Sequence, residues 1–172
     1  MDINNFIYIR AYLLSMSGVG HLGELEVIDY LRKEKKHCIY LPLKDKGIDF
    51  ISIGKDNFYQ IQVKTSMYQK NSYFWFDLYK KKMIYSKNTF YIFVCKSLGR
   101  RKFMGRKFNF LVIPSEMIKK WVKNKSLAEK KNDSGVVNLF IYPNFDSKKW
   151  IYKNKGKSLD LTEYWNNFEQ LK

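Results

Sequence analysis

An acidic, an amide and an ammonium side chain lie close together in the first half of the chain. Asp49 belongs to a short apolar run at 48–53, and Gln62 and Lys64 belong to a second run at 58–64. Because side chains alternate along a strand, Gln62 and Lys64 are expected on the same face. If the two runs pair as a hairpin, the three groups converge at one end of a sheet. Together they can hold a hard divalent cation and a water molecule beside a phosphate.

A second carboxylate, Glu24, is expected on the helix that precedes these runs, at about 21–36. Three apolar residues follow Glu24 at spacings of three, four and seven: Val27, Ile28 and Leu31. Glu24 therefore shares the buried stripe of the helix, whereas Glu26 falls on its polar side. The helical phase selects Glu24 over Glu26 as the acid that can reach the sheet.

The order of these residues resembles the motif of the PD-(D/E)xK nuclease superfamily, which has the restriction-endonuclease-like fold. In that motif a helical Glu is followed by an Asp and then by Glu-x-Lys or Gln-x-Lys on the next strand, and here it reads Glu24, Asp49 and Gln62-Val63-Lys64. Two stretches look like the prokaryotic branch that uses Gln in place of Glu: Gly47-Ile48-Asp49 and Ile61-Gln62-Val63-Lys64-Thr65-Ser66. The resemblance covers roughly residues 20–66. It departs from the motif in two ways, since no Pro precedes Asp49 and Gln62 carries no charge.

The resemblance implies a metal-dependent endonuclease that hydrolyses phosphodiester bonds of DNA with Mg²⁺ or Mn²⁺. Asp49 would bridge the metal, and the Gln62 side-chain oxygen and the Val63 backbone carbonyl would complete the ligands from the protein. Glu24 would bind the ion directly or through water, or hold a second ion. Lys64 would orient the attacking water and stabilise developing charge. Mg²⁺ accepts such a set because one or two carboxylates, with water and substrate oxygens, satisfy its octahedral shell.

The charge balance favours a polyanionic partner. The 172 residues include 32 Lys and Arg against 16 Asp and Glu, a formal net charge of +16. A charge of this size favours fast, salt-sensitive association with nucleic acid. The expected partner is DNA, with RNA as the open alternative. A low-GC genome would also enrich Lys, Asn, Ile, Tyr and Phe through their AT-rich codons, although the acids do not rise in compensation.

Two basic clusters are expected to contact the nucleic-acid backbone. Their residues are Lys80, Lys81, Lys82, Arg100, Arg101, Lys102, Arg106 and Lys107. A solvated surface is the alternative, above all for the triple Lys. The aromatic residues Tyr73, Trp75 and Phe103 could stack on unpaired bases, with core packing as the alternative for most aromatics in the chain.

The order of elements predicts an α/β protein with a restriction-endonuclease-like core, a mixed central sheet flanked by helices. Strands are expected at 38–43, 48–53, 58–65, 73–78, 89–96, 108–113 and 136–142. Helices are expected at 3–16, 21–36 and 115–125, with Ser115 as N-cap, and after Asp160, which forms a capping box with Glu163. We expect one domain over 1–172, with its core at about 20–125 and a C-terminal strand and helix extension at 136–172.

Cellular location and assembly are inferred from the cysteines and the first helix. Cys38 and Cys95 have neither metal-site nor disulfide spacing, which fits a reducing cytoplasm. The apolar segment 6–14 is too short to span a bilayer and contains Arg10, so no membrane association is expected. The helix at 3–16 is apolar around much of its circumference and would be buried in the domain or against a second subunit. Because many members of the superfamily are homodimers, a homodimer is expected.

Other interpretations remain open at this point. Asp49 could cap a turn while Gln62 and Lys64 face solvent on an edge strand, and Glu24 could be a surface acid favoured by the helix dipole. At the level of function, the uncharged Gln62 leaves open the possibility that the chain is a nucleic-acid-binding module, which keeps the nuclease fold but does not cleave nucleic acid. A third possibility is a protein-interaction scaffold whose charge reflects only codon usage.

Overall fold

The computed structural model describes residues 18–42, 47–68, 72–97, 106–130, 133–144 and 146–171. The helix expected at 3–16, and with it the expected dimer contact, lies outside these ranges. Two α-helices occur in the described part, α2 (Val19–Glu34) and α3 (Ser115–Lys123). Neither is long and apolar enough to cross a membrane.

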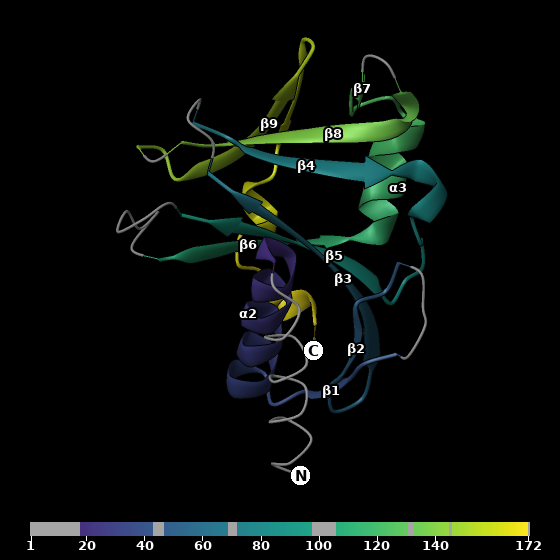
Figure 1. The fold of residues 1–172 in the computed structure, drawn as a ribbon, viewed down its shortest axis with the longest axis vertical. Helices are drawn as coiled ribbons and strands as arrows, with labels where there is room; N and C mark the ends of the chain where they lie inside the picture. Colours follow the sequence, from purple (N-terminus) through teal and green to yellow (C-terminus); the bar gives the residue numbers. More distant parts are fainter. Residues whose placement is uncertain are drawn as a thin grey trace.

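The first sheet has five strands in the order β1-β2-β3-β5-β6 (Figure 1). These strands are β1 (Cys38–Tyr40), β2 (Phe50–Ile53), β3 (Phe58–Met67), β5 (Thr89–Lys96) and β6 (Phe108–Pro114). β3 and β5 pair in parallel, whereas all other neighbours pair antiparallel. The expected mixed sheet is therefore confirmed, and the strand predicted at 89–96 has these bounds in the structure.

A second sheet, all antiparallel, was not expected. It has the order β10-β9-β8-β4, with a short β7 also paired to β8. Its strands are β4 (Phe74–Tyr79), β7 (Glu129–Lys130), β8 (Asp133–Asn144), β9 (Lys149–Asn154) and β10 (Lys157–Asp160). The strand expected at 73–78 belongs to this second sheet as β4, and its alternating burial is typical of a sheet with one wet face.

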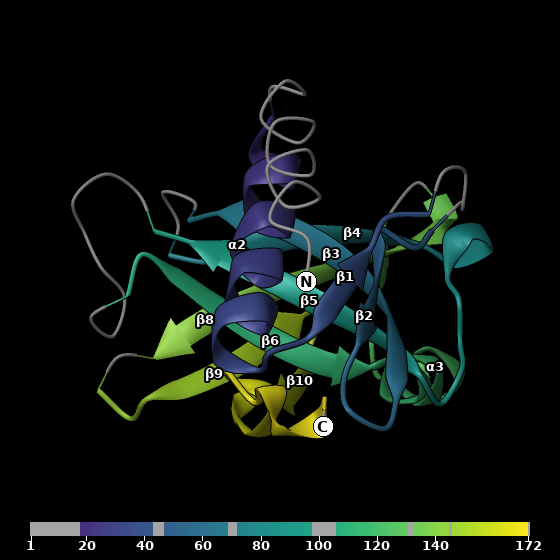
Figure 2. The ribbon, with the colours of Figure 1, turned by 90° about the horizontal axis from the view of Figure 1, so that it is seen from below.

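The first sheet is covered on both faces. On one face the α2 residues Val27, Ile28 and Leu31 pack with Ile61 and Val63 of β3. Figure 2 shows α2 lying across this face. On the other face, residues of β5 and β6 pack with the second sheet and α3 in a separate cluster. The layers are therefore helix, mixed sheet and antiparallel sheet, which confirms the general α/β class.

The C-terminal segment docks as expected but does not form the expected helix. Two 3₁₀ turns occur instead, η2 (Thr162–Tyr164) and η3 (Phe168–Gln170), and the extension at 136–172 thus contains three strands and these turns. The Asp160 carboxylate accepts a hydrogen bond from the Thr162 backbone N–H at 2.9 Å, which closes a tight turn. The Asn166 N–H then donates to the Phe110 carbonyl of β6 at 2.7 Å, so the chain follows the edge of the first sheet. That pairing interrupts helical hydrogen bonding.

The helix α3 begins at Ser115 itself, and Pro114 occupies the N-cap position. The expected capping role of Ser115 was therefore wrong. Its buried hydroxyl instead accepts a hydrogen bond from the Ser86 N–H at 3.0 Å and donates to the Ser86 carbonyl at 2.9 Å. The Ser115 hydroxyl therefore connects α3 to the segment around Ser86 instead of capping the helix. No local sequence pattern reveals such a contact between distant segments.

Candidate functional site

The carboxylate of Asp49 lies where β2 separates from β3. The Asp49 N–H donates to the Ile61 carbonyl at 2.9 Å, next to the Phe50–Ile61 pair of the β2–β3 ladder. The next N–H of β3 that points toward β2, that of Val63, bonds to a side chain instead of a backbone carbonyl. It donates a hydrogen bond to Asp49 Oδ2 at 2.6 Å. A short bond from an amide to a carboxylate is among the stronger hydrogen bonds in proteins. The carboxylate is therefore fixed at the edge of β3 that β2 leaves open.

The backbone carbonyl of Val63 points to the same open edge. In a strand, the N–H and the C=O of one residue point to the same side, and the residues on either side of it point the other way. The Gln60 N–H donates toward β5, to the Asn88 carbonyl at 2.8 Å, which places the even-numbered residues of β3 on the β5 side. Val63 thus directs its carbonyl past the last β2–β3 residue pair, beside the Asp49 carboxylate.

Gln62 and Lys64 share a face of β3, as alternation predicts. Because Ile61 and Val63 pack under α2, Gln62 and Lys64 lie on the opposite face, with Gln62 in register with Tyr91 of β5. Only 7 % of Gln62 is exposed, and Lys64 is partly buried. The alternative in which Gln62 faces solvent was wrong, since Gln62 is buried where β3 pairs with β5.

Glu24 reaches the open edge because α2 packs closely on β3. A Cβ atom at Gly23 would lie 1.9 Å from Thr65 Oγ1, so only glycine allows this approach. The Thr65 hydroxyl also donates to the Gly20 carbonyl at 3.3 Å, which ties the helix to the strand. The next helical residue, Glu24, has a side chain that is 18 % exposed and lies 3.1 Å from His21 Nδ1.

The sequence interpretation overlooked two parts of this arrangement. One is the contact of Gly23 with Thr65, and the other is the pairing of His21 with Glu24. A glycine inside a helical pattern often has a packing reason, which was the available signal. Thr65, which directly follows the motif residue Lys64, is engaged with the helix.

Burial and several nearby charged groups shift the pKa of Asp49. Burial raises this pKa above its ordinary value of 3.8, and the negative charge of Glu24 raises it further. The hydrogen bond from Val63 and the positive charges of Lys64 and His21 oppose the shift. Two carboxylates, an ammonium group and an imidazole therefore lie within electrostatic range of one another. Glu24 acts on Asp49 from α2, and Lys64 acts on it from the opposite face of β3.

The groups at this edge are oxygen donors. The Asp49 carboxylate lies here with the Val63 carbonyl, the charge of Glu24 acts on Asp49 from α2, and Gln62 lies on the face of β3 opposite α2. In the part of the chain that the structure describes, no three His, Cys, Asp or Glu side chains form a group that could hold a metal ion. A cation at this edge would thus depend on the amide and the carbonyl as well as on the two acids.

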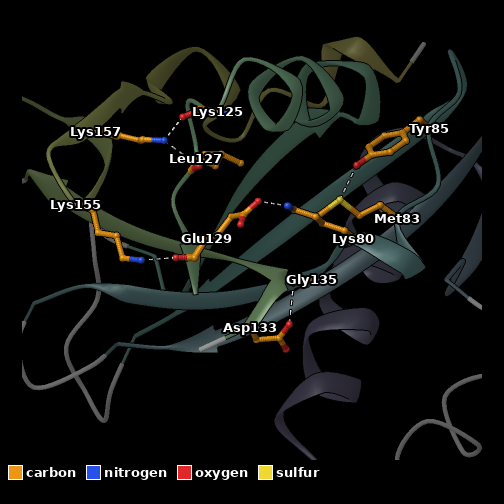
Figure 3. Close-up of polar contacts among 10 residues, drawn as sticks. All are labelled: Lys80, Met83, Tyr85, Lys125, Leu127, Glu129, Asp133, Gly135, Lys155 and Lys157. Atoms are coloured by element: carbon orange, nitrogen blue, oxygen red, sulfur yellow. Dashed lines mark hydrogen bonds and ion pairs between the residues drawn. The ribbon is translucent and has the colours of Figure 1, made fainter. Parts of the chain in front are cut away.

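The first basic cluster lies beside the segment that leads to Asp49. Lys80–Lys82 form a 3₁₀ turn, η1, and a Cβ atom at Gly47 would lie 3.0 Å from the Lys82 carbonyl. Gly47 has φ of +105°, a conformation that L-residues rarely adopt, so this contact depends on glycine. Lys81 and Lys82 are exposed, whereas Lys80 is paired with Glu129 (Figure 3).

The second basic cluster is only partly described. Arg106 and Lys107 are exposed, and Lys107 Nζ lies 5.5 Å from the ring centroid of Phe108. Arg100, Arg101, Lys102 and Phe103 lie outside the described residues.

Comparison of the chain with protein families, with curated proteins and with solved structures found no match. The functional interpretation consequently depends on the residues and geometry described above.

Proposed function

We propose that this chain is a metal-dependent endonuclease that hydrolyses phosphodiester bonds of DNA, with its active site at the open edge of β3. One observation carries the proposal: the Asp49 carboxylate is held by the Val63 N–H within range of the charges of Glu24 and Lys64. In this proposal α2 and the first sheet correspond to a restriction-endonuclease-like core, and the second sheet is an addition to it.

The donor set fits a hard divalent cation. Burial, and to a smaller extent the charge of Glu24, raise the pKa of Asp49, so ionising this carboxyl group in the folded chain has an energetic cost that a cation would offset. Mg²⁺ and Mn²⁺ prefer oxygen ligands and need only one or two carboxylates when water and substrate supply the rest. Asp49, Glu24, the Gln62 amide oxygen and the Val63 carbonyl would hold the ion.

The remaining residues would position the substrate and the attacking water. A bound Mg²⁺ supplies neutralisation of the phosphate charge and a more acidic water. The Lys64 ammonium group would orient that water and stabilise the charge that develops on the phosphate oxygens. Lys81 and Lys82, exposed beside the Gly47 segment, would hold the DNA backbone next to the open edge.

A binding module without cleavage is the second candidate. It is favoured by the finding that the described residues hold no group of three His, Cys, Asp or Glu side chains for a metal. The uncharged Gln62 would then be one of the changes that abolished catalysis, and the net charge of +16 would serve binding alone.

Cleavage of supercoiled plasmid separates the two candidates. The purified chain is incubated with plasmid and Mg²⁺, Mn²⁺ or EDTA, and nicked and linear forms are measured. Asp49→Asn keeps an acceptor for the Val63 N–H, and Lys64→Met keeps the length of the side chain. Asp56→Asn and Lys55→Met are matched controls, because both residues are exposed in the turn between β2 and β3. The nuclease predicts metal-dependent nicking that falls about a hundredfold or more in the first pair only.

The binding module predicts a different result. Plasmid would be retarded on a gel by the wild-type chain and by all four variants, with no nicking in either metal.

A further inference from the structure

The outer face of the second sheet carries a row of aromatic side chains. The members of this aromatic row are Tyr73, Trp75, Phe140 and Tyr142. The ring centroids of Tyr73 and Phe140 are 5.3 Å apart, those of Tyr73 and Tyr142 are 5.5 Å apart, and those of Trp75 and Phe140 are 5.9 Å apart. Trp75 is 44 % exposed, whereas its neighbours Phe74 and Phe76 point into the core. The row therefore presents ring faces and edges to solvent.

Lysines border this row. A hollow of about 550 Å³ is lined by three rings of the aromatic row and by residues 153–158 of the β9–β10 hairpin. Those residues include Lys153, Lys155 and Lys157, and none of the described lining residues is acidic. The surface thus combines π faces with positive charge.

Backbone carbonyls hold two of these lysines in place. Lys155 Nζ donates to the Glu129 carbonyl at 2.6 Å, and Lys157 Nζ donates to the Lys125 carbonyl and, at 3.4 Å, to that of Leu127 (Figure 3). These hydrogen bonds are made to backbone carbonyls and not to carboxylates. Lys153 is exposed and forms no ion pair with any residue that the structure describes.

The positive region continues on the far side of the β9–β10 hairpin. A larger cavity there, of about 860 Å³, is lined by five lysines and two acids. The lysines are Lys80, Lys125, Lys130, Lys155 and Lys157, and the acids are Glu129 and Asp133. The hairpin consequently lies between the hollow beside the aromatic row and this basic cavity, and the ammonium groups of Lys155 and Lys157 lie on the cavity side, against the carbonyls of residues 125–129.

Asp77 lies at the end of the aromatic row and orients Trp75, the most exposed ring of the row. The Trp75 Nε1–H donates to the Asp77 carboxylate at 2.9 Å, and the same carboxylate accepts a hydrogen bond from the Asn138 side chain. Lys130 Nζ lies 4.0 Å from the other Asp77 oxygen, which offsets the negative charge. The indole is thus oriented before any ligand binds, which lowers the entropy cost of stacking.

We infer that this face binds single-stranded nucleic acid, with unpaired bases stacked on the aromatic row and phosphates held by Lys153 and by the positive charge of the neighbouring β9–β10 hairpin. Base stacking on aromatic rings combined with a basic groove is how proteins hold single strands without sequence preference. Bases in a duplex are stacked on one another and cannot reach such rings. This binding does not depend on Asp49 or on cleavage, and it adds an unpaired segment to what the chain recognises.

Fluorescence anisotropy with labelled oligothymidylate, in EDTA, tests the inference. The wild-type chain is expected to bind the single strand more tightly than a labelled duplex of equal length. Trp75→Ala and Tyr142→Ala should each weaken single-strand binding roughly five-fold to a hundredfold, the range that the loss of one stacked base gives. Trp75→Phe should restore most of the affinity. Tyr40→Ala is the control, because Tyr40 is 56 % exposed on β1 of the other sheet, and it should bind as the wild type does.

The lysine contacts have a separate readout. Lys153→Met should lower the slope of log affinity against log salt concentration by about 0.7, the contribution of one phosphate contact to a single strand. Plasmid cleavage requires metal and Asp49, whereas this binding assay is run in EDTA and depends on Trp75 and Lys153, so a failure of the nuclease proposal is distinguishable from a failure of this one.

Three results would overturn the inference. They are equal affinity for single strand and duplex, unchanged binding by Trp75→Ala with a native circular dichroism spectrum, and a wild-type dimer in sedimentation that dissociates in Trp75→Ala. The last result would mean that a second copy of the chain covers the aromatic row.

Discussion

At the scale of single residues, the candidate site depends on the Asp49 carboxylate, which the Val63 N–H fixes at the edge of β3 that β2 leaves open. The pattern of 58–64 was sufficient to place Gln62 and Lys64 on one face, because a period of two is a property of any strand. The apolar residues of the expected helical stripe, Val27, Ile28 and Leu31, are buried as the pattern predicts. The bond between the Asp49 carboxylate and the Val63 N–H was not predictable, because it depends on where β2 leaves β3.

The ionised form of Asp49 should destabilise the folded chain. Its pKa is raised on folding, mainly by burial, so the folded state binds the proton more tightly than the unfolded state. Stability therefore falls as pH rises from the unfolded value of 3.8 through the folded value. Without metal at neutral pH, Asp49→Asn is expected to raise the free energy of unfolding by about 1 kcal/mol, a size seen when a strained functional site is relieved.

Urea denaturation in EDTA measures this difference. The gain should shrink as pH approaches 3.8, where the wild-type carboxyl group is also neutral. Asp56→Asn, at an exposed position, should change nothing. A loss of stability in Asp49→Asn at neutral pH would contradict the electrostatic interpretation.

His37 should have the opposite pH dependence. It is buried, and its Nδ1 lies 2.8 Å from Ser52 Oγ. Burial, and then the charge of Lys35, lower its pKa below the ordinary value of 6.5. The unfolded state then takes up the proton first, so stability is present above pH 6.5 and is lost as pH falls through the folded value.

The variant His37→Gln isolates this effect. It should be less stable at neutral pH by about 1 kcal/mol, the size of a lost hydrogen bond. It should also show a flatter loss of stability on acidification below 6.5, measured by denaturation at stepped pH. An equally steep loss in the variant would show that other groups set the acid limit.

At the scale of elements, the sequence predicted those whose signal is local. The near-continuous apolar run of β5 identified a strand buried on both faces. The second sheet was not predictable in this way, because β4 finds its partner β8 about sixty residues later in the chain. The prediction of a C-terminal helix was wrong for a similar reason. The hydrogen bond of Asn166 with Phe110 is a long-range contact, and it overrides the local capping pattern.

The packing of α2 on β3 gives a test at this scale. Gly23→Ala adds a Cβ atom that would lie 1.9 Å from Thr65 Oγ1, so the helix must shift. We expect a loss of about 1–3 kcal/mol, the cost of overpacking, although Ala is the better helix former by about 1 kcal/mol. Thermal unfolding measures the change.

Two further variants make this test specific. Gly20→Ala, on the same helix with nothing within 4 Å of the added atom, should be neutral or stabilising. Combining Gly23→Ala with Thr65→Ala removes the hydroxyl and should recover part of the loss. No recovery would mean that the helix is held away from β3 by something else.

At the scale of the whole molecule, the net charge of +16 is the property with the broadest consequence. Binding that releases counterions from DNA weakens steeply with salt. We expect affinity for a labelled duplex to fall by roughly a thousandfold between low and physiological salt, as several phosphate contacts give. If the charge reflects codon usage alone, binding to DNA near physiological salt should be negligible. Gel retardation over a series of salt concentrations distinguishes this explanation from functional DNA binding.

The most direct test of the site at the open edge of β3 is a crystal structure of the chain soaked in Mn²⁺, with the ion located by its anomalous scattering. We expect a peak bounded by the Asp49 carboxylate, the Gln62 amide oxygen and the Val63 carbonyl, with Glu24 at direct or water-mediated distance. The peak should vanish in Asp49→Asn and persist in Asp56→Asn. No peak at this edge, with plasmid cleavage still dependent on metal, would contradict the proposed active site.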